Sequence, residues 1–275
     1  MKKAGIIGGT GRMGRLFAGV FRRAGYEVMV SGRSTKVTGH DIARECDLVM
    51  VSVPIRDTVR VIEEIAPLLK KGQLLCDLTS LKAGPVKAML KSEADVIGLH
   101  PMFGPTVASL KKQTIIACPA RAKEATVQAL LDLFRNEGAI CTITDPDEHD
   151  RAMAVVQGLT HFVTLCMAES IRRLSIDIEK TRAFYSPVYQ IELGLVGRLL
   201  SQDPELYGSI LMENPYVPGV LAACRSSVQD LQEIVAKKDA GRFSDFFAQN
   251  SHHFGDYCTE GMAKTDALIE YMVSR

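Results

Sequence analysis

The amino-acid sequence predicts an α/β fold, with a doubly wound parallel sheet in the first half and an all-α domain in the second. Up to Ile143, short β-rich runs alternate with amphipathic stretches, and several runs are continuously apolar, as at residues 48–51. Continuously apolar runs are typical of strands that are buried on both faces. After Ile143 the chain has long segments of helical period and no convincing β alternation.

Seven strands are expected in the first half. They span Ala4–Gly8, Glu27–Ser31, Asp47–Val53, Leu74–Asp77, Val96–Leu99, Thr114–Cys118 and Ile140–Ile143. Amphipathic helices are expected between strands, for example over residues 12–24 and 55–69, where apolar residues recur at helical spacing. Pro54 stands just ahead of the second helix, near the first turn, where its missing N–H costs nothing.

The pattern of apolar residues changes after residue 143. Residues 144–150 are typical of a linker and a helix start, with Asp145 or Asp147 as the N-cap and acidic residues in the first turn. The helical segments that follow are interrupted near residues 175–177, 186–187, 203–204 and 214–219. We therefore expect two domains, residues 1–145 and residues 146–275.

The composition excludes several classes of protein. The 275 residues are 47% hydrophobic, which is ample for a packed core, and the formal net charge of +1 argues against nucleic acid as the main partner. No apolar run approaches the roughly 20 residues of a membrane span, and residues 1–9 do not resemble a signal peptide. The seven cysteines lie far apart and form no Cys-x-x-Cys pair. We expect a reduced, soluble, cytoplasmic protein.

A glycine-rich loop follows the first strand. Residues 9–14, Gly-Thr-Gly-Arg-Met-Gly, match the pattern Gly-x-Gly-x-x-Gly. The pattern is informative because it follows a strand and opens an amphipathic helix, which is the context of a dinucleotide-binding turn. The glycines let the backbone approach a pyrophosphate, which the positive end of the helix dipole attracts. The first half is therefore predicted to be a Rossmann-type dinucleotide-binding domain.

The residues after the second strand indicate which dinucleotide is bound. A domain that binds NAD usually carries Asp or Glu here, because a carboxylate accepts hydrogen bonds from the ribose hydroxyls. This chain has Ser31-Gly32-Arg33-Ser34-Thr35 instead. A guanidinium and hydroxyls suit a 2′-phosphate, so we expect NADP in preference to NAD. The expected cofactor contacts are Gly9, Thr10, Gly11, Arg12, Met13, Gly14, Ser31, Arg33, Ser34, Ser52, Val53 and Pro54.

Polar side chains also follow the fourth and fifth strands. Residues 77–82, Asp-Leu-Thr-Ser-Leu-Lys, follow the fourth, and residues 100–105, His-Pro-Met-Phe-Gly-Pro, follow the fifth. Ligands of an open parallel sheet bind beyond the carboxyl ends of its strands, so Ser80, Lys82 and His100 should converge with the glycine loop on one crevice. His100 is a candidate general base, because an unperturbed imidazole, with a pKa of about 6.5, is mostly neutral at pH 7.

Several separate segments of the chain resemble the prephenate dehydrogenase family. In the first half these are the histidine motif at residues 98–105 and the Ser/Lys turn at residues 77–82. In the second half they are residues 148–150, 157–162, 186–189, 196–199 and 254–257. The similar segments run in order over nearly the whole chain. They look closest to the dehydrogenase part of bacterial enzymes fused to chorismate mutase, and we expect neither that mutase nor a regulatory domain within these residues.

The resemblance implies a reaction of tyrosine biosynthesis. Prephenate would be decarboxylated to 4-hydroxyphenylpyruvate while a hydride passes from its C4 to a nicotinamide cofactor. In such an enzyme His100 would be the catalytic base that accepts the proton of the 4-hydroxyl. Ser80 would orient both His100 and the nicotinamide.

The resemblance also implies residues that bind the substrate. Arg198 looks like the family residue that binds the ring carboxylate, a role that suits a bidentate guanidinium. His161 would line the pocket, with Gln157 one helical turn earlier on the same face. His149 and Lys82 are further expected substrate-site residues. A homodimer formed through the helical domain is expected as well.

Several alternatives stay open from the sequence. Arogenate differs from prephenate only in its side chain, so an arogenate or dual-specificity cyclohexadienyl dehydrogenase remains an alternative, and feedback by tyrosine is undecided. A β-hydroxyacid dehydrogenase or an imine reductase would leave His100 idle, and a non-catalytic NADP-binding sensor would need no intact site. No metal is expected, because His252 and His253 have no further ligands at suitable spacing.

Overall fold

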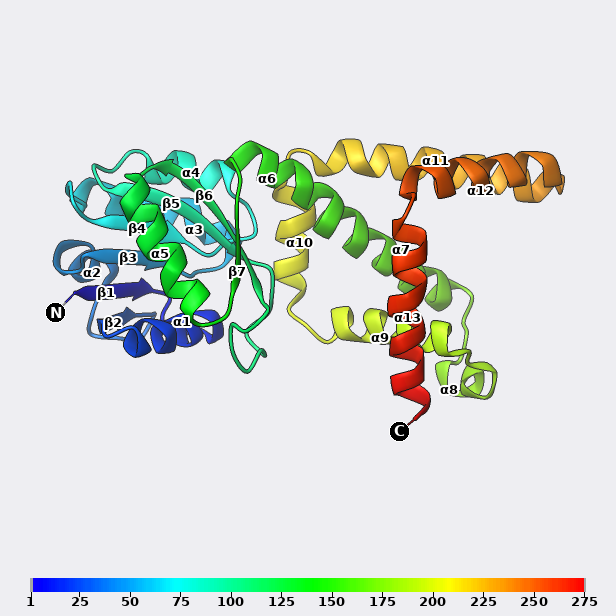
Figure 1. The fold of residues 1–275 in the computed structure, drawn as a ribbon, viewed down its shortest axis with the longest axis horizontal. Helices are drawn as coiled ribbons and strands as arrows, with labels where there is room; N and C mark the ends of the chain where they lie inside the picture. The colour runs from blue at the N-terminus through cyan, green and yellow to red at the C-terminus, as the bar shows by residue number, and fades with distance from the viewer. Residues whose placement is uncertain (1, 275) are drawn as a thin grey trace. The chain divides into compact units, whose positions relative to one another are not determined.

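The computed structural model describes residues 2–274, which form two compact units (Figure 1). The first unit contains the chain up to Val156 together with Glu205–Tyr216, and the second contains Gln157–Pro204 and the chain from Val217 onward. The chain therefore passes three times from one unit to the other. The predicted domain division after residue 145 stays a prediction. Each compact unit combines two separate stretches of the chain and so does not correspond to a single division.

The first unit is built on a seven-stranded sheet. Its strands lie in the order β2-β1-β3-β4-β5-β6-β7. Their bounds are β1 Lys3–Ile7, β2 Glu27–Ser31, β3 Leu48–Val51, β4 Leu74–Asp77, β5 Asp95–Pro101, β6 Thr114–Arg121 and β7 Ile140–Ile143. All seven predicted strands are present, and the predicted Rossmann-type α/β class is confirmed.

One strand departs from the parallel arrangement. β6 runs antiparallel to β5, with His100 opposite Ile116. The connection between these strands, residues 102–113, contains no helix. A parallel neighbour needs a long crossover, which is usually helical, so this short connection returns the chain as an antiparallel strand.

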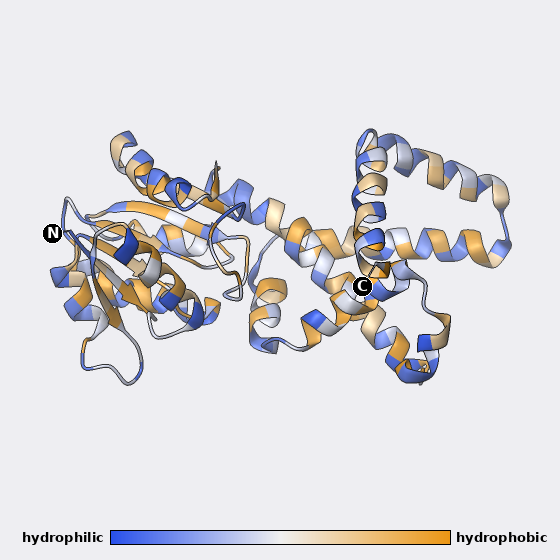
Figure 2. Ribbon diagram, turned by 60° about the horizontal axis from the view of Figure 1, so that its bottom comes forward, coloured by the Kyte–Doolittle hydropathy of each residue, from blue (hydrophilic) through white to orange (hydrophobic). Residues whose placement is uncertain are grey.

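Helices cover both faces of the sheet. On one face lie α1 (Arg12–Arg23) and α5 (Glu124–Asn136), and on the other lie α2 (Gly39–Glu45), α3 (Ile55–Ile65) and α4 (Ala83–Met89). Neighbouring strand residues enter opposite cores, so that Ile6 packs toward α1 and Ile7 toward α2 and α3. This double burial is why the strands are continuously apolar, and Figure 2 colours them accordingly.

The first unit also contains α6 (Pro146–Met153) and nearly all of α10 (Pro204–Glu213). Asp145 is the N-cap of α6, and its side chain accepts hydrogen bonds from the backbone N–H groups of Asp147 and Glu148, each at 2.9 Å. The sequence left Asp145 and Asp147 as alternatives, and the structure selects the first. After α6 the helix continues as a π-helix over Ala154–Leu159.

The second unit is entirely helical in the part of the chain that the structure describes. Its helices are α7 Thr160–Arg173, α8 Ile178–Thr181, α9 Pro187–Leu200, α11 Val217–Lys237, α12 Ala240–Phe254 and α13 Tyr257–Val273, with a 3₁₀ turn at Arg182–Phe184. Each of the four predicted interruptions coincides with a break between two helices, although Pro187, Pro204 and residues 217–219 already belong to the helices that follow. The apolar residues of this unit are poorly covered within one chain, since Phe247 and Phe254 are 67% and 55% exposed.

One helix is longer and more apolar than the sequence analysis allowed. The structure joins α6, the π segment and α7 into Pro146–Arg173, which by length and composition alone could cross a membrane. The prediction that no run approaches that length is wrong by this measure. The measure is weak on its own, because the core helix of a soluble protein also meets it. The helix begins with His149 and Asp150 buried in the first unit, but only 17% of its apolar stretch is buried within the chain.

Candidate functional site

The glycine loop forms a turn that only glycine can make. Gly8 has a φ of +83°, and a Cβ on it would lie 2.1 Å from the Ser52 carbonyl oxygen. A Cβ on Gly14 would lie 2.6 Å from the carbonyl oxygen of Gly8. The N-cap of α1, Gly11, has no side chain to cap the helix, which leaves its first N–H groups for an anion. The loop therefore fits a dinucleotide pyrophosphate.

A cleft of about 760 Å³ adjoins this loop. It lies where the ends of β1, β2 and β3 meet, and the strand order reverses about β1, so this is the switch point at which open α/β sheets bind ligands. Eight of the predicted cofactor contacts line the cleft: Thr10, Gly11, Ser31, Arg33, Ser34, Ser52, Val53 and Pro54. The other four (Gly9, Arg12, Met13 and Gly14) belong to the loop and the first turn of α1.

The charges of the cleft bear on the predicted preference for NADP. Arg33 is exposed and makes no ion pair within residues 2–274. The two carboxylates that line the cleft, Asp57 and Glu64, both bind Arg60, at 3.3 and 2.7 Å. Ser31, where an NAD-binding domain usually carries a carboxylate, is buried at the end of β2. The cleft therefore offers a cation for a phosphate and no unpaired carboxylate for a ribose.

A buried ion pair lies at the end of β4. The Lys82 ammonium binds the Asp77 carboxylate and also donates to the Leu99 carbonyl oxygen at 2.7 Å. Both side chains are fully buried. Asp77 Oδ2 also accepts from the Thr79 N–H at 3.0 Å. The Lys82 ammonium is thus bound by two partners within the first unit. We propose a structural role for Lys82 in place of the predicted substrate contact.

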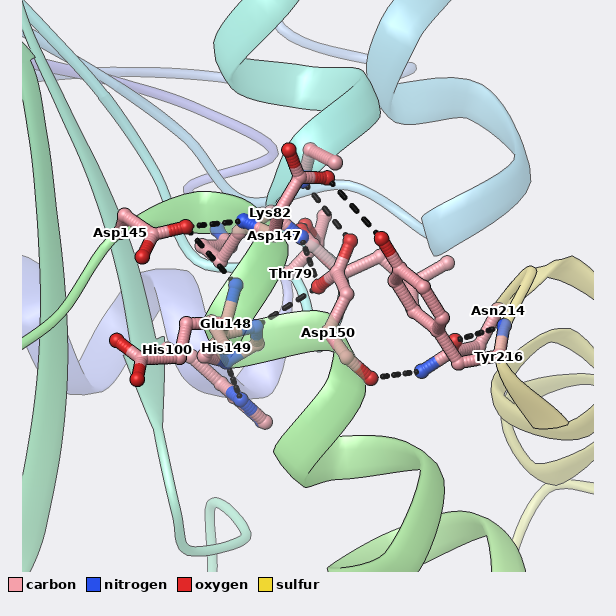
Figure 3. Close-up of polar contacts among 12 residues, drawn as sticks. Thr79, Lys82, His100, Asp145, Asp147, Glu148, His149, Asp150, Asn214 and Tyr216 are labelled. Carbon is pink, nitrogen blue, oxygen red and sulfur yellow. Dashed lines mark hydrogen bonds and ion pairs between the residues drawn. The ribbon is translucent and has the colours of Figure 1, made fainter. Parts of the chain in front are cut away.

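His100 lies within β5 and is only 2% exposed. Its Nδ1 lies 2.9 Å from Nε2 of His149, and Nδ1 of His149 lies 2.8 Å from Oδ1 of Asp150 (Figure 3). Asp150 also accepts the backbone N–H of Lys82 at 2.8 Å and that of Ala83 at 2.9 Å. These contacts form a buried chain that runs from β5 through α6 to the start of α4.

The environment of His100 keeps its imidazole neutral. Burial first, and then the electrostatic influence of His149 and Lys82, hold the pKa of His100 well below its ordinary value. A neutral imidazole at pH 7 can accept a proton, which is the property a general base needs. Ser80 is half-buried in the turn that follows β4, the strand next to β5. His100, Ser80 and the glycine loop therefore all lie at the carboxyl edge of the sheet.

Three predicted residues lie in the second unit. His161 is half-buried near the start of α7, and burial lowers the pKa of its imidazole. Arg198 is exposed on α9. Gln157 lies in the π segment, where hydrogen bonds span five residues. The turn between Gln157 and His161 is therefore partly π-helical, and the roles of both residues stay predictions.

Sequence reasoning missed residues that support this arrangement. Asp150 follows His149 directly in the sequence, yet its contacts with Lys82 and Ala83 span 68 and 67 residues. Asn214, which follows α10, donates from its amide to the Asp150 carbonyl oxygen at 2.8 Å. The adjacent His-Asp pair was a usable local signal for Asp150. Nothing local pointed to Asn214.

A glycine cradle at the switch point of a mostly parallel sheet, with a buried neutral histidine at the same edge, defines a nicotinamide-dependent oxidoreductase. Sequence models narrow this class. The family described as "Prephenate dehydrogenase, nucleotide-binding domain" matches residues 33–143, and "Prephenate dehydrogenase, dimerization domain" matches residues 145–249. The chain belongs to the prephenate dehydrogenase family.

Individual relatives agree with this membership. The chain is 35% identical to a "Probable arogenate/prephenate dehydrogenase" of Methanocaldococcus jannaschii, over 98% of this chain and 65% of that protein. It is 34% identical to a "T-protein" of Haemophilus influenzae, over 96% of this chain and 70% of that protein. The chain thus spans about two thirds of the length of these relatives.

A solved structure shares the fold. The prephenate dehydrogenase of Aquifex aeolicus, crystallised with hydroxyphenyl propionate and NAD⁺, superposes with a TM-score of 0.73. The alignment covers 92% of this chain and 97% of that one, at 19% sequence identity. It supports the architecture described above.

Proposed function

We propose that this protein oxidises and decarboxylates prephenate to 4-hydroxyphenylpyruvate, with NADP⁺ as the preferred hydride acceptor. The observation that carries the proposal is His100, a buried imidazole held neutral at the carboxyl edge of the sheet, the same edge at which the glycine loop lies, although His100 itself does not line the dinucleotide cleft. A neutral base at this edge suits removal of a hydroxyl proton as the adjacent carbon loses a hydride. The M. jannaschii relative, named for both arogenate and prephenate, keeps the dual-specificity alternative open.

The dinucleotide would be held by the residues of the cradle and the cleft. The uncapped N-terminus of α1 would take the pyrophosphate, and Arg33 with Ser34 would take the 2′-phosphate. When bound, the nicotinamide supplies the acceptor for the hydride. His100 would take the hydroxyl proton, and Ser80 would orient His100 toward the substrate. Arg198 would bind the ring carboxylate, and His161 and Gln157 would contact the substrate.

The activity is tested by following reduction at 340 nm with prephenate or arogenate, each with NAD⁺ or NADP⁺. We expect turnover with prephenate and NADP⁺. Turnover with arogenate as well would establish dual specificity, and turnover with arogenate alone would refute the substrate. NADPH binding without any turnover would point to a sensor. The His100→Asn variant should keep NADPH affinity and lose about 10²- to 10⁴-fold in kcat.

The cofactor preference is tested separately at Arg33. A charge-assisted contact is worth about 1.5–3 kcal/mol, so Arg33→Gln should weaken NADP⁺ about 10- to 150-fold and leave NAD⁺ nearly unchanged. Lys36→Gln is the matched control, because it removes a positive charge from the same loop but not from the cleft lining. If both variants behave alike, or if NAD⁺ is preferred by the wild type, Arg33 does not bind a 2′-phosphate.

The helical unit supports the proposal of a homodimer. The matched family segment is described as a dimerization domain, and helices α7, α12 and α13 have no buried residues within the single chain. A second copy that covers these apolar side chains would explain both observations. Sedimentation at several concentrations tests it, and a monomer at every concentration would refute it. We propose a cytoplasmic enzyme with neither membrane nor nucleic-acid partners.

A further inference from the structure

The buried residues His149 and Asp150 have no part in the reaction proposed above. His149 was predicted to contact the substrate, but it is 1% exposed, and both of its ring nitrogens have protein partners. We propose that His149 and Asp150 are positioning residues that hold His100 in the tautomer with hydrogen on Nδ1 and a lone pair on Nε2. This inference rests on the proposed function of His100 as the base.

The direction of the hydrogen bonds is set at Asp150. Its two oxygens accept from the N–H groups of Lys82 and Ala83 at the start of α4, so its carboxylate acts as an acceptor on both sides. The neighbouring Nδ1 of His149, at 2.8 Å from Oδ1, must therefore carry the hydrogen. In the proposed arrangement His149 carries a single ring hydrogen, on Nδ1, and therefore has a lone pair on Nε2.

That lone pair determines the state of His100. Nε2 of His149 lies 2.9 Å from Nδ1 of His100, and two lone pairs would repel each other at this distance. Nδ1 of His100 therefore donates, and Nε2 of His100 is the nitrogen with the lone pair. This is the tautomer that a base acting through Nε2 requires, because the partner of one ring nitrogen decides the state of the other.

Ring packing, a backbone hydrogen bond and burial also fix the positions of these residues. The rings of His100 and His149 meet edge to face, with centroids 5.1 Å apart. The Asp150 backbone is fixed by Asn214, whose amide donates to its carbonyl oxygen at 2.8 Å (Figure 3). Burial on all sides keeps water from competing for these groups. The orientation of the base is thus set by residues that need not touch the substrate.

Two variants of His149 separate positioning from substrate binding. In His149→Gln the amide oxygen can reach the place of Nε2 and accept from His100, whereas in His149→Asn the shorter amide still meets Asp150 but not His100. We expect His149→Gln to keep most of kcat. We expect His149→Asn to lose about 10- to 100-fold in kcat at little changed KM for prephenate, by analogy with the loss seen when the partner that orients a metal-binding imidazole is removed.

The tautomer itself is read by NMR without any substrate. Long-range ¹H–¹⁵N spectra of the full-length protein show which ring nitrogen of His100 carries hydrogen, with the His100→Asn variant used to assign the signal. Glu148→Gln is the matched control on α6, because Glu148 is exposed and adjacent to His149. It should leave both the signal and kcat unchanged.

The outcomes are distinct. Hydrogen on Nε2 of His100 in the wild type would overturn the proposal, whatever the activity. Equal kcat in His149→Gln and His149→Asn, or a KM effect without a kcat effect, would overturn it as well. Hydrogen on Nδ1 in a protein that turns over neither prephenate nor arogenate would instead refute the proposed function and leave the tautomer assignment standing.

Discussion

The buried pair of Lys82 and Asp77 should be among the most sensitive points of the first unit. Lys82→Met keeps the aliphatic stem and removes the ammonium. The Asp77 carboxylate, fully buried, then loses its counter-ion and keeps its contact with Thr79. The Leu99 carbonyl oxygen loses the donor that lies 2.7 Å away. Removal of one partner leaves an uncompensated charge in a place that water cannot reach.

The expected cost is large compared with the stability of a domain. Breaking a buried ion pair at one partner costs about 3–5 kcal/mol, and the lost hydrogen bond adds about 1 kcal/mol. Total stabilities are about 5–15 kcal/mol. With a urea dependence of about 3 kcal/mol per M, the unfolding midpoint of Lys82→Met should fall by about 1–2 M.

Urea unfolding followed by circular dichroism measures this, with Asp77→Asn and the double variant alongside. Removing both charges leaves no isolated ion, so the double variant should lose clearly less than the sum of the single losses. A loss below about 1 kcal/mol in Lys82→Met, or simple additivity, would show that the pair does not carry the energy its burial implies.

Three further predictions concern the site. Since the lowered pKa of His100 keeps the base neutral, kcat/KM for prephenate should not change as the pH is lowered through 6.5, and it should fall only at a clearly more acidic pH. A profile that already falls at pH 6.5 would contradict the effect of burial. Arg198→Gln should raise KM for prephenate with kcat little changed, because a carboxylate contact made equally in the ground and transition states is lost, and an unaltered KM would mean a structural role. Gly14→Ala should weaken NADPH binding, measured by fluorescence titration, because the added Cβ meets the Gly8 carbonyl oxygen at 2.6 Å, whereas Gly84→Ala, with 3.8 Å to its nearest neighbour, should not.

The sheet was predictable because its signals are local. Strands buried on both faces, such as Leu48–Val51, read as apolar runs, and the glycine loop marks where β1 gives way to α1. The direction of β6 was not predictable from its own residues, since parallel and antiparallel strands look alike and only the lack of a helix at residues 102–113 decides it. The π segment at Ala154–Leu159 changes the winding without a sequence signal that we recognised.

The candidate site was predictable where chemistry follows a strand end. His100 and Ser80 lie at the predicted sheet edge, and most expected cofactor contacts line one cleft. Burial was the property that sequence could not supply. Lys82 and His149 are polar residues of suitable chemistry, but their partners lie 5 and 49 residues away, and only folding shows that both are enclosed by protein.

The path of the chain between its two compact units affects how such enzymes can be recombined. His100 lies before the boundary at residue 145 that separates the matched family segments, whereas His149, Asp150 and Asn214 lie after it, in α6 and beyond α10. A chimera joined at this boundary would inherit its base from one parent and the residues that surround that base from the other. Exchanges that carry residues 146–156 and 205–216 along with the sheet keep the whole first unit of a single parent.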